Sequence, residues 1–137
     1  MNSKKPKILH EIAGKPMLQH LLQTIESMEV ANTYVVVGSG AEQVQEAFST
    51  ESVEFVLQQE QVGTGHAVIQ AADQLKQDRT LILVGDAPLV IKQSLDRLLG
   101  VDSELAILSA DHPDPFNYGR ILREGDNVNS IVEERDA

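Results

Sequence analysis

The sequence has no cysteine, no hydrophobic run long enough for a membrane helix, and 11 Lys and Arg residues against 21 Asp and Glu residues. Without cysteine the chain has neither a disulfide framework nor a thiolate metal site. No apolar run approaches the roughly 18 residues of a membrane helix, and none follows the N-terminal lysines as a signal peptide requires. We therefore expect a cytoplasmic protein with no membrane partner.

The net charge of −10 argues against a broad basic surface for nucleic acid, so no nucleic-acid partner is predicted. Local lysines and backbone amides can still hold a small phosphorylated ligand. Hydrophobic residues make up 42% of the 137 residues, which is a globular balance. With no repeat, low-complexity tract or linker, the sequence predicts one domain over residues 1–137.

Short hydrophobic runs alternate with amphipathic stretches through most of the chain. We predict strands at Thr33–Val37, Val53–Gln58, Thr80–Val84 and Leu105–Ala110, and helices at Gly14–Val30, Ala41–Phe48, Thr64–Leu75 and Ile91–Leu99. This alternation predicts an α/β fold, with a mostly parallel sheet covered by helices on both faces. After Tyr118, the runs Arg120–Leu122 and Val128–Val132 flank a turn at Gly125-Asp126-Asn127, which predicts an antiparallel ribbon near the C-terminus.

Ligands of open parallel sheets bind beyond the carboxyl ends of the strands, which places Gln58–Gly65 and Gly85–Pro88 at the binding edge. In the first segment, Gly63 and Gly65 flank Thr64 at a strand-to-helix junction. Glycines there allow close approach of a ligand, and the amides of a helix start suit an anion or a base edge. The alternative is a tight turn in which Thr64 is the helix N-cap.

Two charged residues fit a phosphate site. Asp86 directly follows the predicted strand Thr80–Val84, where a carboxylate can hold Mg²⁺ together with ligand phosphates. Lys7 precedes a short apolar run, and its ammonium group suits phosphate. The alternatives are a turn aspartate beside Pro88 and a solvated surface lysine.

Further candidates lie elsewhere in the chain. Gly119 either exposes its amide to a ligand or permits a bend, and Glu133 either accepts hydrogen bonds from sugar hydroxyls or charges a sheet edge. Gly38-Ser39-Gly40 begins like a dinucleotide fingerprint, but position 43 is Gln, so we discount it. The four scattered histidines have no metal-ligand spacing and are interpreted as structural or surface residues.

Five segments in order, PKILHEIAGKPM, LQQEQVGTGHA, LVGDAPL, NYGRI and IVEERDA, resemble the successive signatures of the bacterial N-acetylglucosamine-1-phosphate uridylyltransferase family. The resemblance covers nearly the whole chain and implies a Rossmann-like nucleotidyltransferase fold. It implies Mg²⁺-dependent transfer of UMP from UTP to N-acetylglucosamine-1-phosphate, giving UDP-N-acetylglucosamine and pyrophosphate. Such a product serves cell-wall peptidoglycan and lipopolysaccharide synthesis.

The resemblance also implies roles for matching positions. Gln58, Gly63 and Thr64 recognise uracil, Gly85 lies next to the nucleotide, Lys7 contacts phosphate, and Asp86 binds Mg²⁺. Lys7 and Asp86 are therefore the expected catalytic residues. Gly119, through its backbone, and Glu133 contact the N-acetylglucosamine moiety.

Two departures set this chain apart from the family. The family begins with a strand and a glycine-rich loop, L-A-A-G-x-G-T-R-M, and Met1 falls at the final methionine of that motif. The chain also stops after Ala137, before a second Mg²⁺ ligand and the acetyltransferase domain. We expect an impaired fragment or a gene whose start is placed too late. A sheet centre without that strand favours self-association by strand exchange.

Three alternatives stay open at this point. The chain is a non-catalytic module that binds a UDP-sugar, a relic without ligand, or a nucleotidyltransferase acting on another sugar-1-phosphate or nucleotide.

Overall fold

The computed structural model describes residues 5–125 and 127–133. Two compact units divide the chain, Met1–Leu99 and Gly100–Ala137, and each is described by itself. The prediction of one domain over residues 1–137 stays a prediction.

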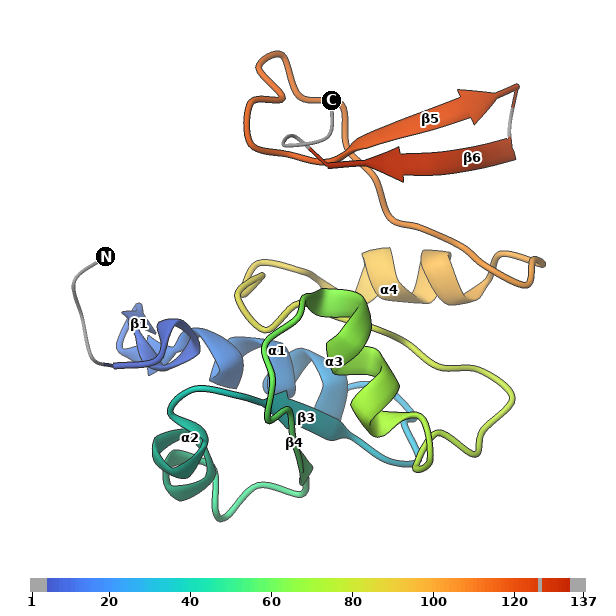
Figure 1. Cartoon of the computed structure of the whole chain (residues 1–137). Coiled ribbons are helices and arrows are strands. Elements are labelled where there is room, and N and C mark those ends of the chain that lie inside the picture. The colour runs from blue at the N-terminus through green and yellow to red at the C-terminus, as the bar shows by residue number, and fades with distance from the viewer. Residues whose placement is uncertain (1–4, 126, 134–137) are drawn as a thin grey trace. The chain divides into compact units, whose positions relative to one another are not determined.

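A pair of parallel strands forms the centre of the first unit (Figure 1). Strand β3 (Tyr34–Val37) pairs with β4 (Glu54–Leu57), with Val35 opposite Phe55 and Val37 opposite Leu57. Both were predicted from their apolar runs. β3 is one residue shorter than predicted, at its start, and β4 is one residue shorter at each end. The carboxyl ends of the two strands lie at the same edge. There the backbone N–H of Gln58 donates to the carbonyl oxygen of Val37 at 2.8 Å.

The hydrophobic core lies against one face of β3, the face that carries Val35 and Val37. Helix α1 (Met17–Glu26) contributes Leu18 and Leu22, which are four residues apart and therefore on one side of the helix. Helix α2 (Ala41–Ala47) and the residue that follows it complete the core. Its buried members are Leu9, Leu18, Leu22, Val35, Val37, Val44 and Phe48.

Helix α3 (Thr64–Ala71) follows β4 and contacts both strands of the pair (Figure 1). It is shorter than predicted because residues 72–75 form tighter turns, with the amides of Ala72 and Leu75 each bonded to the carbonyl three residues earlier. Helix α4 (Lys92–Leu99) agrees with its predicted range to within one residue, and its Leu95 is fully buried.

Near the N-terminus, a short 3₁₀ helix η1 (Lys7–Leu9) precedes a small antiparallel hairpin that the sequence did not predict. Its strands are β1 (Glu11–Ile12) and β2 (Lys15–Pro16). The two turn residues, Ala13 and Gly14, have φ of 51° and 80°. Positive φ at both turn residues is typical of a two-residue hairpin turn. Alanine rarely takes a positive φ, so the sequence Ala13-Gly14 did not indicate such a turn.

The strands predicted at Thr80–Val84 and Leu105–Ala110 are wrong, because neither segment forms a strand. A strand needs a neighbour for its backbone hydrogen bonds, and within residues 5–125 and 127–133 no strand pairs with either segment. Ile82 is 61% exposed and Leu105 is 75% exposed. The apolar pattern of a buried strand was present, but the described residues supply no partner for it.

The second unit contains an antiparallel hairpin of β5 (Arg120–Glu124) and β6 (Asn127–Val132), which confirms the predicted ribbon. A bulge shifts the register between Leu122 and Arg123. Gly125 takes a φ of 62° in the turn, while Asp126 of the predicted turn lies outside the described residues.

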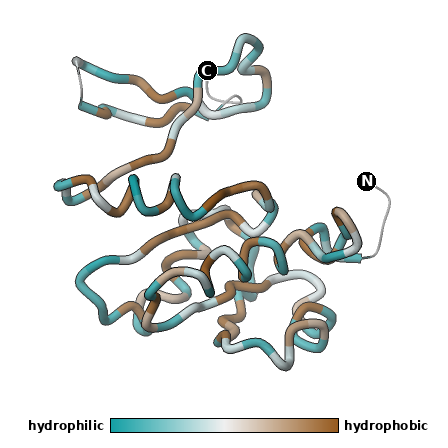
Figure 2. The backbone as a smooth tube through the Cα atoms, turned by 180° about the vertical axis from the view of Figure 1, so that it is seen from behind, coloured by the Kyte–Doolittle hydropathy of each residue, from teal (hydrophilic) through white to brown (hydrophobic). Residues whose placement is uncertain are grey.

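The α/β class is confirmed. In Figure 2, short hydrophobic stretches alternate with hydrophilic ones along the backbone, as the sequence pattern indicated. Within the described part of the chain, no helix is long and apolar enough to cross a membrane.

Candidate functional site

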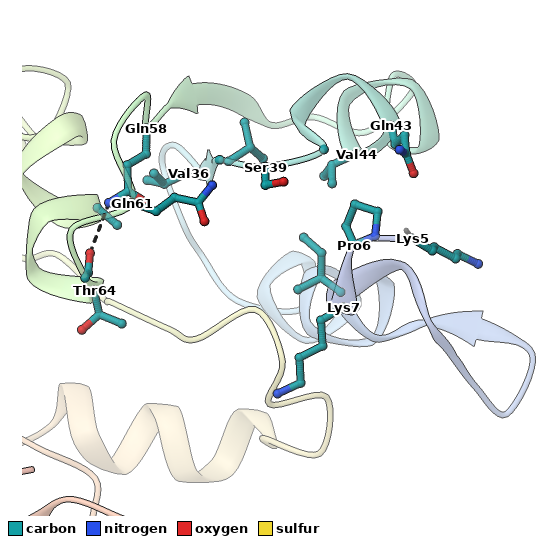
Figure 3. A pocket seen from close by; sticks show the side chains of 16 residues that line it. Lys5, Pro6, Lys7, Val36, Ser39, Gln43, Val44, Gln58, Gln61 and Thr64 are labelled. Carbon is teal, nitrogen blue, oxygen red and sulfur yellow. Dashed lines mark hydrogen bonds between the residues drawn. The ribbon is translucent and has the colours of Figure 1, made fainter. Parts of the chain in front are cut away.

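A hollow of ≈ 680 Å³ lies in the first unit, beyond the carboxyl ends of β3 and β4 (Figure 3). Its lining includes three segments: the turn Gly38-Ser39-Gly40 after β3, residues between Gln58 and Thr64 after β4, and residues 5–8. The predicted nucleotide residues Lys7, Gln58, Gly63 and Thr64 all line this hollow. Of the two segments that the sequence placed at the binding edge, Gln58–Gly65 contributes to the lining of this hollow, and Gly85–Pro88 does not.

The loop between β4 and α3 has its shape because of Gly63. This residue has a φ of 117°, a conformation that side chains disfavour, and it is the N-cap of α3. The amide nitrogen Nε2 of Gln58 donates to the carbonyl oxygen of Gly63 at 3.2 Å, a bond drawn in Figure 3. Thr64 is the first residue of α3, so the alternative that Thr64 caps the helix is wrong. Its exposed side chain instead borders the hollow.

Lys7 and Asp86 form an ion pair next to this edge. Nζ of Lys7 lies 2.5 Å from Oδ2 of Asp86, and the side chains are 62% and 37% exposed. Gly85 lies against η1, since a Cβ on Gly85 would stand 3.3 Å from Cγ2 of Ile8. Both residues of the predicted Gly85-Asp86 turn thus lie beside η1, and neither belongs to the lining of the hollow, although Gly85 was predicted to lie next to the nucleotide.

Asp86 offers one carboxylate to a divalent cation, and no cluster of three acidic or histidine side chains occurs in the described residues. Mg²⁺ is usually held by one or two carboxylates, with phosphate oxygens and waters completing its shell. A single exposed carboxylate beside an ammonium group fits a Mg²⁺ ion that arrives with a polyphosphate. It does not fit an ion held by protein alone.

The predicted sugar residues come together in the second unit. The pairing of Arg120 with Val132 places Gly119 opposite Glu133. A Cβ on Gly119 would stand 3.6 Å from Oε2 of Glu133 and 3.3 Å from Cγ2 of Ile131. Both residues are exposed, so the backbone of Gly119 and an exposed carboxylate lie side by side on this hairpin.

Sequence reasoning discounted Gly38-Ser39-Gly40, which the structure places in the lining of the hollow. Gly40 has a φ of 75°, and a Cβ there would stand 2.5 Å from Cγ of Pro6. Only glycine allows this approach of the two loops. The sequence did contain a signal for this loop, because two glycines directly follow a predicted strand. The glutamine at position 43 argues against a dinucleotide fingerprint but not against a role for these glycines.

His66 is a second residue that sequence reasoning missed. Its Nδ1 lies 3.0 Å from Nε2 of Gln58, and its Nε2 lies 3.2 Å from the amide nitrogen of Gln70. His66 and Gln70 are four residues apart in a predicted helix, so their contact could be expected from the sequence. The contact of His66 with Gln58 depends on the conformation of the loop between β4 and α3, which the sequence pattern does not give.

The family model of the MobA-like NTP transferase domain matches residues 1–123. The bifunctional protein GlmU of Methylobacillus flagellatus is 47% identical over 138 residues, covering 100% of this chain and 30% of that protein. GlmU of Alcanivorax borkumensis is 46% identical over 140 residues, covering 100% of this chain and 31% of that protein. The chain thus spans about a third of the length of these relatives.

Solved structures share the fold. HddC from Yersinia pseudotuberculosis is 24% identical with a TM-score of 0.78, over 98% of this chain and 62% of that chain. A second structure of HddC, complexed with GMP-PN, has a TM-score of 0.74 at 24% identity, over 95% of this chain and 60% of that chain.

Proposed function

The chain belongs to the MobA-like NTP transferase family, and we propose that its hollow binds the uracil nucleotide of a uridylyl-transfer reaction. The proposed reaction is transfer of UMP from UTP to N-acetylglucosamine-1-phosphate. A phosphate oxygen of the sugar-1-phosphate bonds to the α-phosphorus of UTP, the bond from that phosphorus to the bridging oxygen breaks, and pyrophosphate leaves. UTP, N-acetylglucosamine-1-phosphate and UDP-N-acetylglucosamine are therefore the proposed ligands.

One observation carries this proposal: a side-chain amide with a fixed orientation and a lysine line the same hollow. Gln58 is held by the carbonyl oxygen of Gly63, and Lys7 borders the same hollow. A planar amide is suited to the polar edge of a nucleobase, and an ammonium group to phosphate. The GlmU relatives and the motifs LQQEQVGTGHA and LVGDAPL support uracil as the base.

In this proposal the protein acts by positioning and by neutralising charge, and it forms no covalent intermediate. Lys7 contacts a phosphate, and Gly85 lets the chain pass close to the nucleotide. Asp86 holds Mg²⁺, which stabilises negative charge on the transferred group. Lys7 and Asp86 are the proposed catalytic residues, and Gly119 and Glu133 the proposed sugar contacts.

Calorimetric titration of the chain with UDP-N-acetylglucosamine and Mg²⁺ tests the proposal. We expect binding that is lost in Gln58→Ala and kept in Gln59→Ala. Gln59 is the matched control because it is the exposed neighbour of Gln58 and lies outside the lining of the hollow. A folded chain that does not bind, or equal binding by the two variants, contradicts the proposal.

A pyrophosphate-release assay separates catalysis from binding. Release from UTP and N-acetylglucosamine-1-phosphate that disappears in Asp86→Asn supports the transferase. Binding without release supports the alternative of a non-catalytic UDP-sugar module, and release with a different sugar-1-phosphate or with CTP or dTTP supports a related transferase.

A further inference from the structure

Three side chains form a hydrogen-bonded row beside the hollow: Gln58, His66 and Gln70. The amide nitrogen of Gln58 lies 3.2 Å from the carbonyl oxygen of Gly63 and 3.0 Å from Nδ1 of His66. On the other side of the ring, Nε2 of His66 meets the amide of Gln70 at 3.2 Å. All three side chains are half-buried.

The contact with Gly63 determines how the whole row is oriented. A carbonyl oxygen only accepts, so the atom of Gln58 beside it must be the NH₂ group. The same NH₂ group faces Nδ1 of His66, and that nitrogen must therefore be the unprotonated acceptor. A neutral imidazole then carries its hydrogen on Nε2. The Gln70 amide, turned by half a rotation about its last bond, presents its oxygen to that hydrogen.

This arrangement leaves one polar atom of Gln58 for a ligand. Both hydrogens of its NH₂ group are engaged, one by Gly63 and one by His66. Its oxygen, Oε1, has no hydrogen-bond partner among the described residues, and Gln58 lines the hollow. The side chain therefore offers an acceptor alone, although a free glutamine offers a donor as well.

We propose that His66 is a positioning residue that, together with the carbonyl group of Gly63, holds the Gln58 amide with both hydrogens engaged and Oε1 free to accept, and thereby selects bases with an N3–H group over cytosine. This inference rests on the proposed function, because it requires a pyrimidine nucleotide in the hollow. Uracil and thymine carry a hydrogen on N3 that Oε1 accepts. Cytosine has a lone pair at N3, which faces the lone pairs of Oε1 and leaves both groups unpaired.

The test compares the binding of UDP, CDP and dTDP to the full chain and to two variants. His66→Phe keeps a ring but removes the acceptor. His66→Asn restores an acceptor, because its Oδ1 stands the same number of bonds from the backbone as Nδ1. We expect the preference for UDP over CDP to fall about fivefold in His66→Phe, the worth of one hydrogen bond between neutral groups, and to return in His66→Asn.

The ratio of UDP to dTDP binding is the internal control. Thymine has the same N3–H edge as uracil, so this ratio stays constant in both variants even if overall affinity falls. An unchanged preference for UDP over CDP in His66→Phe overturns the role of His66 and leaves the proposed function standing. Equal binding of UDP and CDP by the unaltered chain also overturns it. A folded chain that binds no UDP overturns both proposals.

A second measurement needs no ligand and no variant. Nitrogen-15 NMR spectra distinguish a protonated from an unprotonated ring nitrogen in a neutral imidazole. The proposal requires the Nε2–H form of His66, with Nδ1 unprotonated. A hydrogen on Nδ1 contradicts the proposal, whatever the His66 variants do to folding.

Discussion

Nζ of Lys7 lies 2.5 Å from Oδ2 of Asp86, a contact between residues 79 positions apart in the chain. It joins the 3₁₀ helix η1 to the turn after Val84, next to the hollow that Lys7 lines. Both side chains are substantially exposed. Water screens such a pair, so its contribution to the stability of the fold is small. Its main consequence is that it places one positive and one negative charge next to the hollow.

We expect Lys7→Met to lower the free energy of unfolding by less than about 1 kcal/mol. The same change should lower UTP affinity roughly tenfold, because it removes a charged donor to phosphate. Urea unfolding and calorimetry measure the two effects. Lys92→Met is the matched control, since it breaks a similarly exposed pair with Asp96 away from the hollow. Equal loss of UTP binding in both variants contradicts the assignment of Lys7.

The two glycines of the Gly63-Thr64-Gly65 turn should respond to alanine in opposite directions. Gly63 has a φ of 117°, so Gly63→Ala strains the backbone, with a cost of about 1–3 kcal/mol. Gly65 lies inside α3 with nothing within 4 Å of an added Cβ. Gly65→Ala should stabilise by about 0.4–1 kcal/mol, because alanine reduces the conformational freedom of the unfolded chain. Urea unfolding measures both changes, and destabilisation by both substitutions contradicts this account of the turn.

On the hairpin, Glu133→Gln should weaken UDP-N-acetylglucosamine binding and leave UDP binding unchanged. The substitution keeps the size of the side chain and removes the charged acceptor beside Gly119. A lost hydrogen bond to a charged group corresponds to a decrease of roughly tenfold or more. Glu124→Gln, on the same hairpin, serves as the control. A decrease in UDP affinity that equals the decrease for the sugar nucleotide contradicts a sugar-specific role.

The fold was predictable where local pattern decides it. Leu18, Leu22 and Ile25 recur at helical spacing and form one side of α1, and the apolar runs around Val35 and Phe55 became paired strands. Thr80–Val84 has the same kind of pattern but forms no strand. Pairing depends on a neighbour, and a sequence pattern alone does not reveal whether the neighbour is there.

The candidate site was predictable in part for a related reason. Gln58, Gly63 and Thr64 lie close together in the sequence, on the connection from β4 to the first residue of α3, so their proximity follows from this short segment itself. The contact of Lys7 with Asp86 and the approach of Gly40 to Pro6 depend on tertiary structure. His66 was not predicted as a site residue. Its proposed role depends on hydrogen bonds to the side-chain amides of Gln58 and Gln70, which residue spacing does not reveal.

NMR titration of the nitrogen-15-labelled chain with UDP tests the central claim, that the hollow beyond β3 and β4 holds a uracil nucleotide. We predict that the side-chain amide signals of Gln58 and the backbone amides of Gly63 and Thr64 shift during the titration and saturate together. A folded chain in which these signals stay unchanged, or in which shifts are confined to the separate hollow around His20, Thr24 and Lys92, contradicts the claim.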